Sequence, residues 1–91
     1  MNNLVTYTEL AGTETPQVCP VLDVDGNIIR LKLPRRTVIG SPVKIEADNT
    51  LSLGEVCHCH QEEDGYVVHV ELLQSLRHVA ELTRLARALL A

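Results

Sequence analysis

Apolar and polar residues alternate along two stretches of the chain, residues 51–60 and 66–72. Successive side chains of a strand point to opposite faces, so each stretch predicts a strand with one face on a core and one on water. The residues between them, 61–65, are polar or acidic and end in the Asp64-Gly65 pair typical of hairpin turns. A lone hairpin is only marginally stable in water, so other elements must cover its apolar face.

Shorter segments with a strand-like pattern precede this hairpin. They cover residues 4–7, 17–24, 28–33 and 43–46, and turn residues such as Asp25-Gly26-Asn27 separate them. Proline cannot donate to a strand ladder, so the second segment is expected to be an edge strand, or to be bent or bulged at Pro20. Five or six short strands predict a small antiparallel barrel or sandwich, because closure removes exposed edges.

The last part of the chain changes to a helical period. Its pattern predicts an amphipathic helix over residues 75–90, with Ser75 as the N-cap. The apolar stripe is wide enough to cover the barrel and still meet a second copy of the chain, so the helix could form a homodimer. The candidate residues for that interface are Leu82, Leu85, Leu89 and Leu90. We interpret residues 1–15 as a flexible N-terminal segment and residues 16–91 as one domain.

Composition narrows the class of protein. With 91 residues the chain is one small domain, and it has no Phe or Trp and only Tyr7 and Tyr66, so its core must consist of Val, Leu and Ile. Base stacking on aromatic side chains is nearly excluded, and we expect no nucleic-acid partner. No apolar run reaches the roughly 18 residues of a membrane span, and no signal peptide is recognisable, which favours a cytoplasmic protein with no membrane contact.

Positive charge is concentrated in one segment. Residues 27–45 carry no acid, whereas residues 1–26 and 46–72 carry acids and no base. The basic residues of the segment are Arg30, Lys32, Arg35, Arg36 and Lys44. If the protein binds an anion, we expect it to bind at this segment. The alternative is that the segment is a solvated strand face, neutralised by the acidic residues 62–64.

The order of these motifs resembles that of the PilZ domain family. The similarity runs from residue 18 to residue 75 and rests on VLDVDGNIIRLKLPR, the Gly40-x-Pro42-Val43-x-Ile45 strand start, LGEVCHCH and DGYVVHVEL. The resemblance implies a six-stranded antiparallel barrel with a C-terminal helix. It also implies a role in bacterial signalling, because many PilZ domains bind the second messenger cyclic di-GMP.

The ligand motifs of that family are only partly present. The family binds cyclic di-GMP with an R-x-x-x-R segment before the first barrel strand and a D/N-x-S-x-x-G motif on the second. Asp23 matches the first position of the second motif, but Asp25 stands at the serine position and Ile28 at the glycine position. Residues 1–29 contain no arginine. A second carboxylate near two phosphates repels them.

The resemblance therefore implies a regulatory or adaptor domain with a degenerate cyclic di-GMP motif, acting mainly through contacts with a protein partner. The alternative is an effector domain that binds cyclic di-GMP or another nucleotide through a shifted set of arginines. The ligand residues of that alternative are Asp23, Arg30, Arg35 and Arg36. Apart from cyclic di-GMP as a ligand, we expect no cofactor.

The stretch Cys57-His58-Cys59-His60 has the residue types of a metal site but not the spacing. On a regular strand the two cysteines share one face and the two histidines the other, so the four cannot converge on one ion. A tetrahedral site would need further ligands from Cys19, His69 or another subunit. We therefore expect no metal, two small buried cysteines and two solvated histidines, with all three cysteines of the chain reduced.

Catalysis has one candidate set, which combines Cys57 or Cys59 with His69 or His78. Nothing resembles a nucleophile elbow, and a barrel of this size offers little room for a deep pocket. The sequence predicts that the protein is not an enzyme and has no catalytic residue.

Overall fold

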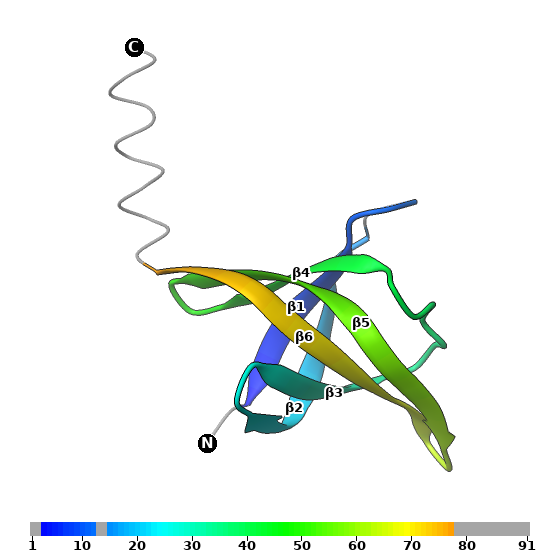
Figure 1. The fold of residues 1–91 in the computed structure, drawn as a ribbon. Helices are drawn as coiled ribbons and strands as arrows, with labels where there is room; N and C mark the ends of the chain where they lie inside the picture. Colours follow the sequence, from blue (N-terminus) through cyan, green and yellow to red (C-terminus); the bar gives the residue numbers. More distant parts are fainter. Residues whose placement is uncertain (1–2, 13–14, 78–91) are drawn as a thin grey trace.

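The computed structural model describes residues 3–12 and 15–77, which form a closed barrel of antiparallel strands (Figure 1). The strands are β1 (Leu4–Glu9), β2 (Gln17–Asp25), β3 (Ile28–Leu33), β4 (Pro42–Ala47), β5 (Thr50–Glu62) and β6 (Gly65–Arg77). Their order around the barrel is β1-β2-β3-β6-β5-β4, and pairing of β4 with β1 closes it. The predicted six-stranded antiparallel barrel is confirmed.

Alternation along each strand separates the core from the outer face. On β3, Ile29, Leu31 and Leu33 are buried, while Arg30 and Lys32 point outward. On β6, Val68 and Val70 are buried in the core, and Val67 is buried as well although it lies outside the core cluster. The buried core cluster consists of Val5, Tyr7, Cys19, Ile29, Leu31, Leu33, Val43, Ile45, Val56, Val68 and Val70. The core is thus mainly Val, Leu and Ile, as composition predicts.

Two hairpin turns follow from local sequence. Gly26 and Asn27 form the loop between β2 and β3, and Gly26 has a φ of 61°. A two-residue loop with a positive φ at its first position is the type II′ pattern, which favours glycine there. The loop between β5 and β6 is also shorter than predicted: Glu62 pairs with Gly65, so only residues 63 and 64 turn.

The pairing between strands of the described residues is irregular at three places. In β2 the register shifts between Val21 and Asp23, close to Pro20, where the sequence predicts a bend or bulge. Between β5 and β6 it shifts twice, at Leu53/Gly54 and at Val56/His58. Bulges increase the local twist and redirect side chains. The second shift in β5 places the histidines described below.

Two boundaries differ from the sequence prediction. β1 pairs with both β2 and β4, so the barrel begins at Leu4 and not at residue 16. Ser75 is not a helix N-cap, because it lies in β6 opposite Ser52, and the two hydroxyl oxygens are 2.9 Å apart. Pairing with β5 continues the strand to Arg77, where helical periodicity predicted the first turn of a helix.

The rest of that predicted helix lies outside the described residues. The predicted dimer-interface residues Leu82, Leu85, Leu89 and Leu90 belong to this part of the chain. Among the residues that the structure describes, no helix has the length and apolar character needed to span a bilayer.

Candidate functional site

One row of polar side chains crosses the outer face of four neighbouring strands. Asp23 of β2 is opposite Arg30 of β3, Arg30 is opposite His69 of β6, and His69 is opposite His58 of β5. The Arg30 Nε donates to Asp23 Oδ1 at 2.6 Å, and its Nη2 donates to Asp23 Oδ2. Such a bidentate pair offsets the charge of both groups, so an anion bound by Arg30 would compete with the Asp23 carboxylate.

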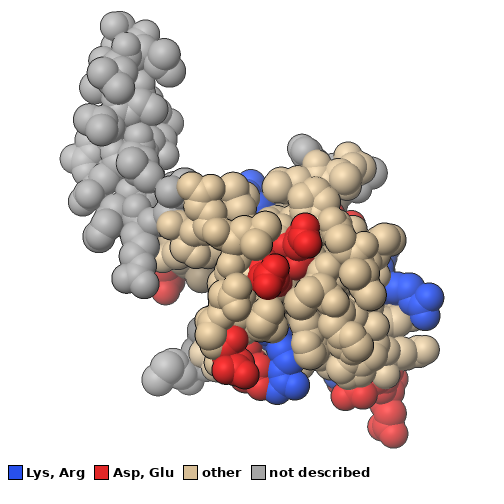
Figure 2. Space-filling view, viewed as in Figure 1, with Lys and Arg blue, Asp and Glu red and all other residues tan. Residues whose placement is uncertain are grey.

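The other strand-borne basic residues are also paired. Lys32 Nζ lies 2.5 Å from Asp64 Oδ1, and Lys44 Nζ lies 3.5 Å from Glu46 Oε1. The hydrogen bond from Lys32 lowers the pKa of Asp64. Figure 2 shows Lys and Arg side chains at separate places on the viewed face, interspersed with Asp and Glu. The three basic residues that lie on strands, Arg30, Lys32 and Lys44, are therefore each paired with an acid in the fold.

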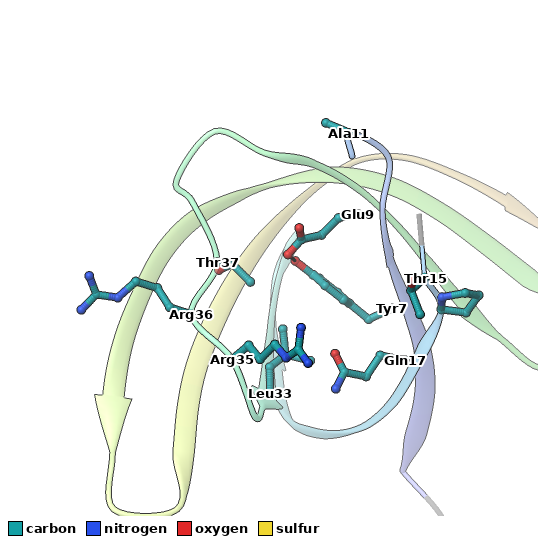
Figure 3. Close-up of a pocket in the computed structure, with 10 residues that line it drawn as sticks. Tyr7, Glu9, Ala11, Thr15, Gln17, Leu33, Arg35, Arg36 and Thr37 are labelled. Atoms are coloured by element: carbon teal, nitrogen blue, oxygen red, sulfur yellow. Dashed lines mark hydrogen bonds between the residues drawn. The ribbon is translucent and has the colours of Figure 1, made fainter. Parts of the chain in front are cut away.

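Arg35 and Arg36 follow β3 at one end of the barrel, beside a hollow of about 550 Å³. The Arg35 side chain points into the hollow toward Gln17, whereas Arg36 points away from it (Figure 3). The residues lining the hollow are Tyr7, Glu9, Ala11, Thr15, Pro16, Gln17, Leu33, Arg35, Arg36 and Thr37. Among the described side chains, neither arginine has an ion-pair partner.

Both positively and negatively charged residues line the hollow. Tyr7 donates a hydrogen bond to Glu9 Oε1 at 3.2 Å, and burial together with the Glu9 charge raises the pKa of Tyr7. Thr37 is buried, and its hydroxyl has no hydrogen-bond partner within the described part of the chain. A phosphate placed against Arg35 would also meet the carboxylate of Glu9.

The predicted ligand residues thus fall into two separate groups. Asp23 and Arg30 are bound to each other on the outer face, and Arg35 and Arg36 lie beyond the end of β3. A strand rises about 3.3 Å per residue, so β3 carries the chain about 10 Å from Arg30 to Leu33 before Arg35 is reached. The four residues do not converge on one patch.

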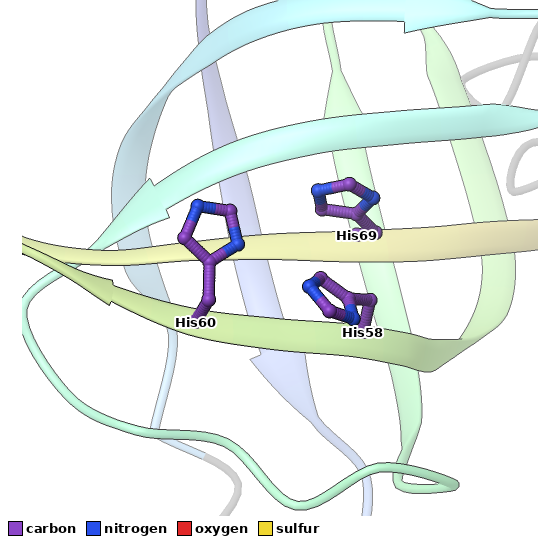
Figure 4. A group of neighbouring side chains, drawn as sticks. All are labelled: His58, His60 and His69. Carbon is purple, nitrogen blue, oxygen red and sulfur yellow. The ribbon is translucent and has the colours of Figure 1, made fainter.

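Three histidines do converge, on the outer face of the β5–β6 hairpin (Figure 4). His58 and His60 lie on β5 and His69 on β6. The imidazole centroids are 4.9 Å apart for His58 and His69, 5.3 Å for His58 and His60, and 6.0 Å for His60 and His69. Burial and the nearby His58 lower the pKa of His69, which favours its neutral form.

The β-bulge at Cys57 creates this arrangement. Val56 pairs with Val70 and His58 with His69, which leaves Cys57 as the extra residue. Cys57 and His58 are therefore both exposed, and the Cys57 thiol donates to the His69 carbonyl oxygen at 3.4 Å, whereas Cys59 packs against the core. Cys57 and Cys59 do not share one buried face, contrary to the alternation argument.

The histidine cluster is not apparent from the sequence. The alternation pattern predicts a regular strand over residues 57–60, and His69 is only one of several further candidate ligands. Two signals were present in the sequence. His58 and His60 are two positions apart, which places them on the same face of a strand, and His69 lies on the returning strand of the hairpin. Only the pairing register of β5 and β6, which the bulge sets, shows that the three histidines are neighbours.

Two of the three thiols, those of Cys57 and Cys19, should differ sharply in reactivity. Burial raises the pKa of the Cys19 thiol to about 11, so at pH 8 only about 0.1 % of it is the reactive thiolate. In the native protein we expect Cys57 to react with a disulfide reagent first and Cys19 at least 100-fold more slowly, until denaturant exposes it. Absorbance of the released thiol, followed over time, measures both phases. Cys57→Ser should remove the fast phase, and a fast phase that persists would contradict the bulge.

The fold and these surfaces define a class: a small closed β-barrel domain whose strand-borne Lys and Arg residues are paired with acids and whose β5–β6 hairpin carries three clustered histidines. Comparisons of the chain with models of known protein families, with curated proteins and with solved structures give no match.

Proposed function

We propose that the chain is a PilZ-like regulatory or adaptor domain that acts through contacts with a protein partner and has lost most of its affinity for cyclic di-GMP. The observation that carries this proposal is the bidentate pair between Arg30 and Asp23. A nucleotide phosphate bound by Arg30 would compete with the Asp23 carboxylate for the guanidinium and would be repelled by it. Asp23 is the one residue that matches the family's ligand motif, and its carboxylate is already engaged.

Exposed apolar side chains support the protein-contact part of the proposal. Leu4 of β1 is opposite Pro20 of β2, and both point away from the core. With Val18 and Leu22 they form the β1–β2 strip, in which Leu4, Val18 and Leu22 are 46%, 65% and 46% exposed. Adjacent apolar side chains on an outer sheet face favour contact with another protein surface. A partner with a complementary apolar patch would bury this strip.

The second candidate function is nucleotide binding through Arg35, and the hollow at the end of the barrel favours it. Arg35 enters that hollow beside the amide of Gln17. These groups suit an anionic ligand with hydrogen-bonding edges. The carboxylate of Glu9 in the same hollow weakens phosphate binding, so this function ranks second.

Calorimetric titration of cyclic di-GMP into the purified protein separates the two functions. We expect no binding heat at ligand concentrations of about 100 µM, because the two groups of arginines do not converge. The variant Arg35→Ala/Arg36→Ala is titrated alongside, and Lys44→Ala is the control for general loss of positive charge. Micromolar binding that the double variant abolishes and Lys44→Ala preserves would overturn the adaptor proposal in favour of the second function.

A further inference from the structure

We propose that His58, His60 and His69 bind one divalent transition-metal ion of the Zn²⁺ type on the outer face of the β5–β6 hairpin. One potential ligand atom from each imidazole lies within 4.8 Å of those of the other two. Neutral imidazole is a common ligand of Zn²⁺, and three protein ligands leave a fourth position for water or for a donor from a partner. This proposal is independent of the adaptor function and of cyclic di-GMP.

The distances are close to those of a bound ion. Zn–N bonds of about 2.0–2.1 Å in a tetrahedral site separate two ligand nitrogens by about 3.4 Å. The imidazoles therefore have to approach one another by at most about 1.4 Å from their present limit of 4.8 Å. His58 is exposed and the His60 side chain is 42% exposed, so both rings can rotate without disturbing the core. The strand pairing of β5 and β6 holds the three backbones in place.

Within the part of the chain that the structure describes, one buried imidazole nitrogen of the group has no hydrogen-bond partner. Nε2 of His69 is buried from solvent, and no described residue donates to it or accepts from it. A buried polar atom without a partner costs free energy, which a metal bond would recover. This atom distinguishes the cluster from histidines that are merely solvated on a strand face.

Charge around the cluster is compatible with a cation. Arg30 is the neighbouring positive side chain on β3, and its bidentate pair with Asp23 neutralises it. On β5 the Glu62 carboxylate lies 4.0 Å from His60 Nε2 and adds negative charge at the other side. Carboxylates next to ligating histidines raise their basicity and fix their orientation in metal sites.

Titration of Zn²⁺ into the full chain, free of any polyhistidine tag, tests the proposal. We expect one equivalent of Zn²⁺ to bind with micromolar or tighter affinity. Free Zn²⁺ at about 100 times the dissociation constant should raise the melting temperature by about 10–20 °C. His58→Ala and His60→Ala should each weaken binding at least 100-fold, since even loss of an outer partner costs about 10- to 100-fold. Both positions are on the outer face, and the melting temperature of each metal-free variant checks that it folds.

Two variants are matched controls. His78→Ala removes a histidine outside the described residues and should leave the affinity for Zn²⁺ unchanged. Cys57→Ser removes the exposed thiol beside His69 and should also leave it unchanged. Absence of binding at millimolar Zn²⁺, equal affinity in His58→Ala, or loss of binding in either control would overturn the three-histidine site.

Discussion

Gly54→Ala is expected to lower the free energy of unfolding by about 2–4 kcal/mol, a large share of the stability of a domain of this size. A Cβ at position 54 would overlap the Glu71 carbonyl oxygen of β6 and would stand 3.0 Å from both the Glu71 carbonyl carbon and Val70 Cγ1. The obstacle is mainly backbone, so no side-chain rotation relieves it. Urea unfolding, followed by circular dichroism, measures the change.

Glu55→Ala is the matched control for this prediction. Glu55 is the next residue of β5 and is exposed, so its replacement should change the free energy of unfolding by less than about 0.5 kcal/mol. The overlap at Gly54 follows from the close approach of β6 beside the register shift at Leu53/Gly54. A Gly54→Ala protein as stable as the wild type would mean that the strands do not approach so closely.

Alkaline pH is expected to destabilise the barrel because two buried acids resist ionisation. Burial raises the pKa of Cys19 from 9.0 to about 11, and it also raises the pKa of Tyr7 above its ordinary value of 10.0. Below pH 9 both groups are protonated in the folded and unfolded states, so neither contributes a pH dependence. Above pH 9 only the unfolded state releases the Cys19 proton, and stability falls as the pH rises.

The magnitude follows from the size of the pKa shift. One pH unit of differential ionisation corresponds to about 1.4 kcal/mol, so Cys19 alone should cost about 2–3 kcal/mol by pH 11. Tyr7 adds a loss in the same direction above pH 10. The urea midpoint measured from pH 8 to pH 11 checks this. Cys19→Ala should abolish the decline between pH 9 and 10, and a wild-type midpoint that stays constant over that interval would contradict the burial of this thiol.

Much of the barrel could be predicted from local pattern. β3 follows the two-residue period, and its inward residues are those that alternation identifies. On β6 the core residues Val68 and Val70 are also those that alternation identifies, but the outer residue Val67 is buried too. Gly26 marks a tight turn whose backbone needs a positive φ. These features depend on near neighbours in the chain, which a single sequence displays directly.

The end of β6 shows where local pattern fails. Residues 75–77 fit a helical period, yet they pair with Thr50, Leu51 and Ser52 of β5. Helix and strand patterns are both compatible with a short apolar run, and tertiary pairing decides between them. The role of β1 is not predicted from local pattern for the same reason. Its pairing with β2 and β4 makes it part of the closed barrel, whereas the sequence predicts a flexible segment there.

By itself the sequence determined most of the strand segments, the inner and outer faces of β3, the main turns and the concentration of basic residues in one segment. Only the tertiary structure decided which outer side chains become neighbours. It paired Arg30 with Asp23, separated both from Arg35, and used the bulge at Cys57 to bring His58 and His60 beside His69. The physical reason is that cross-strand neighbours depend on register and bulges, and one inserted residue changes every partner beyond it.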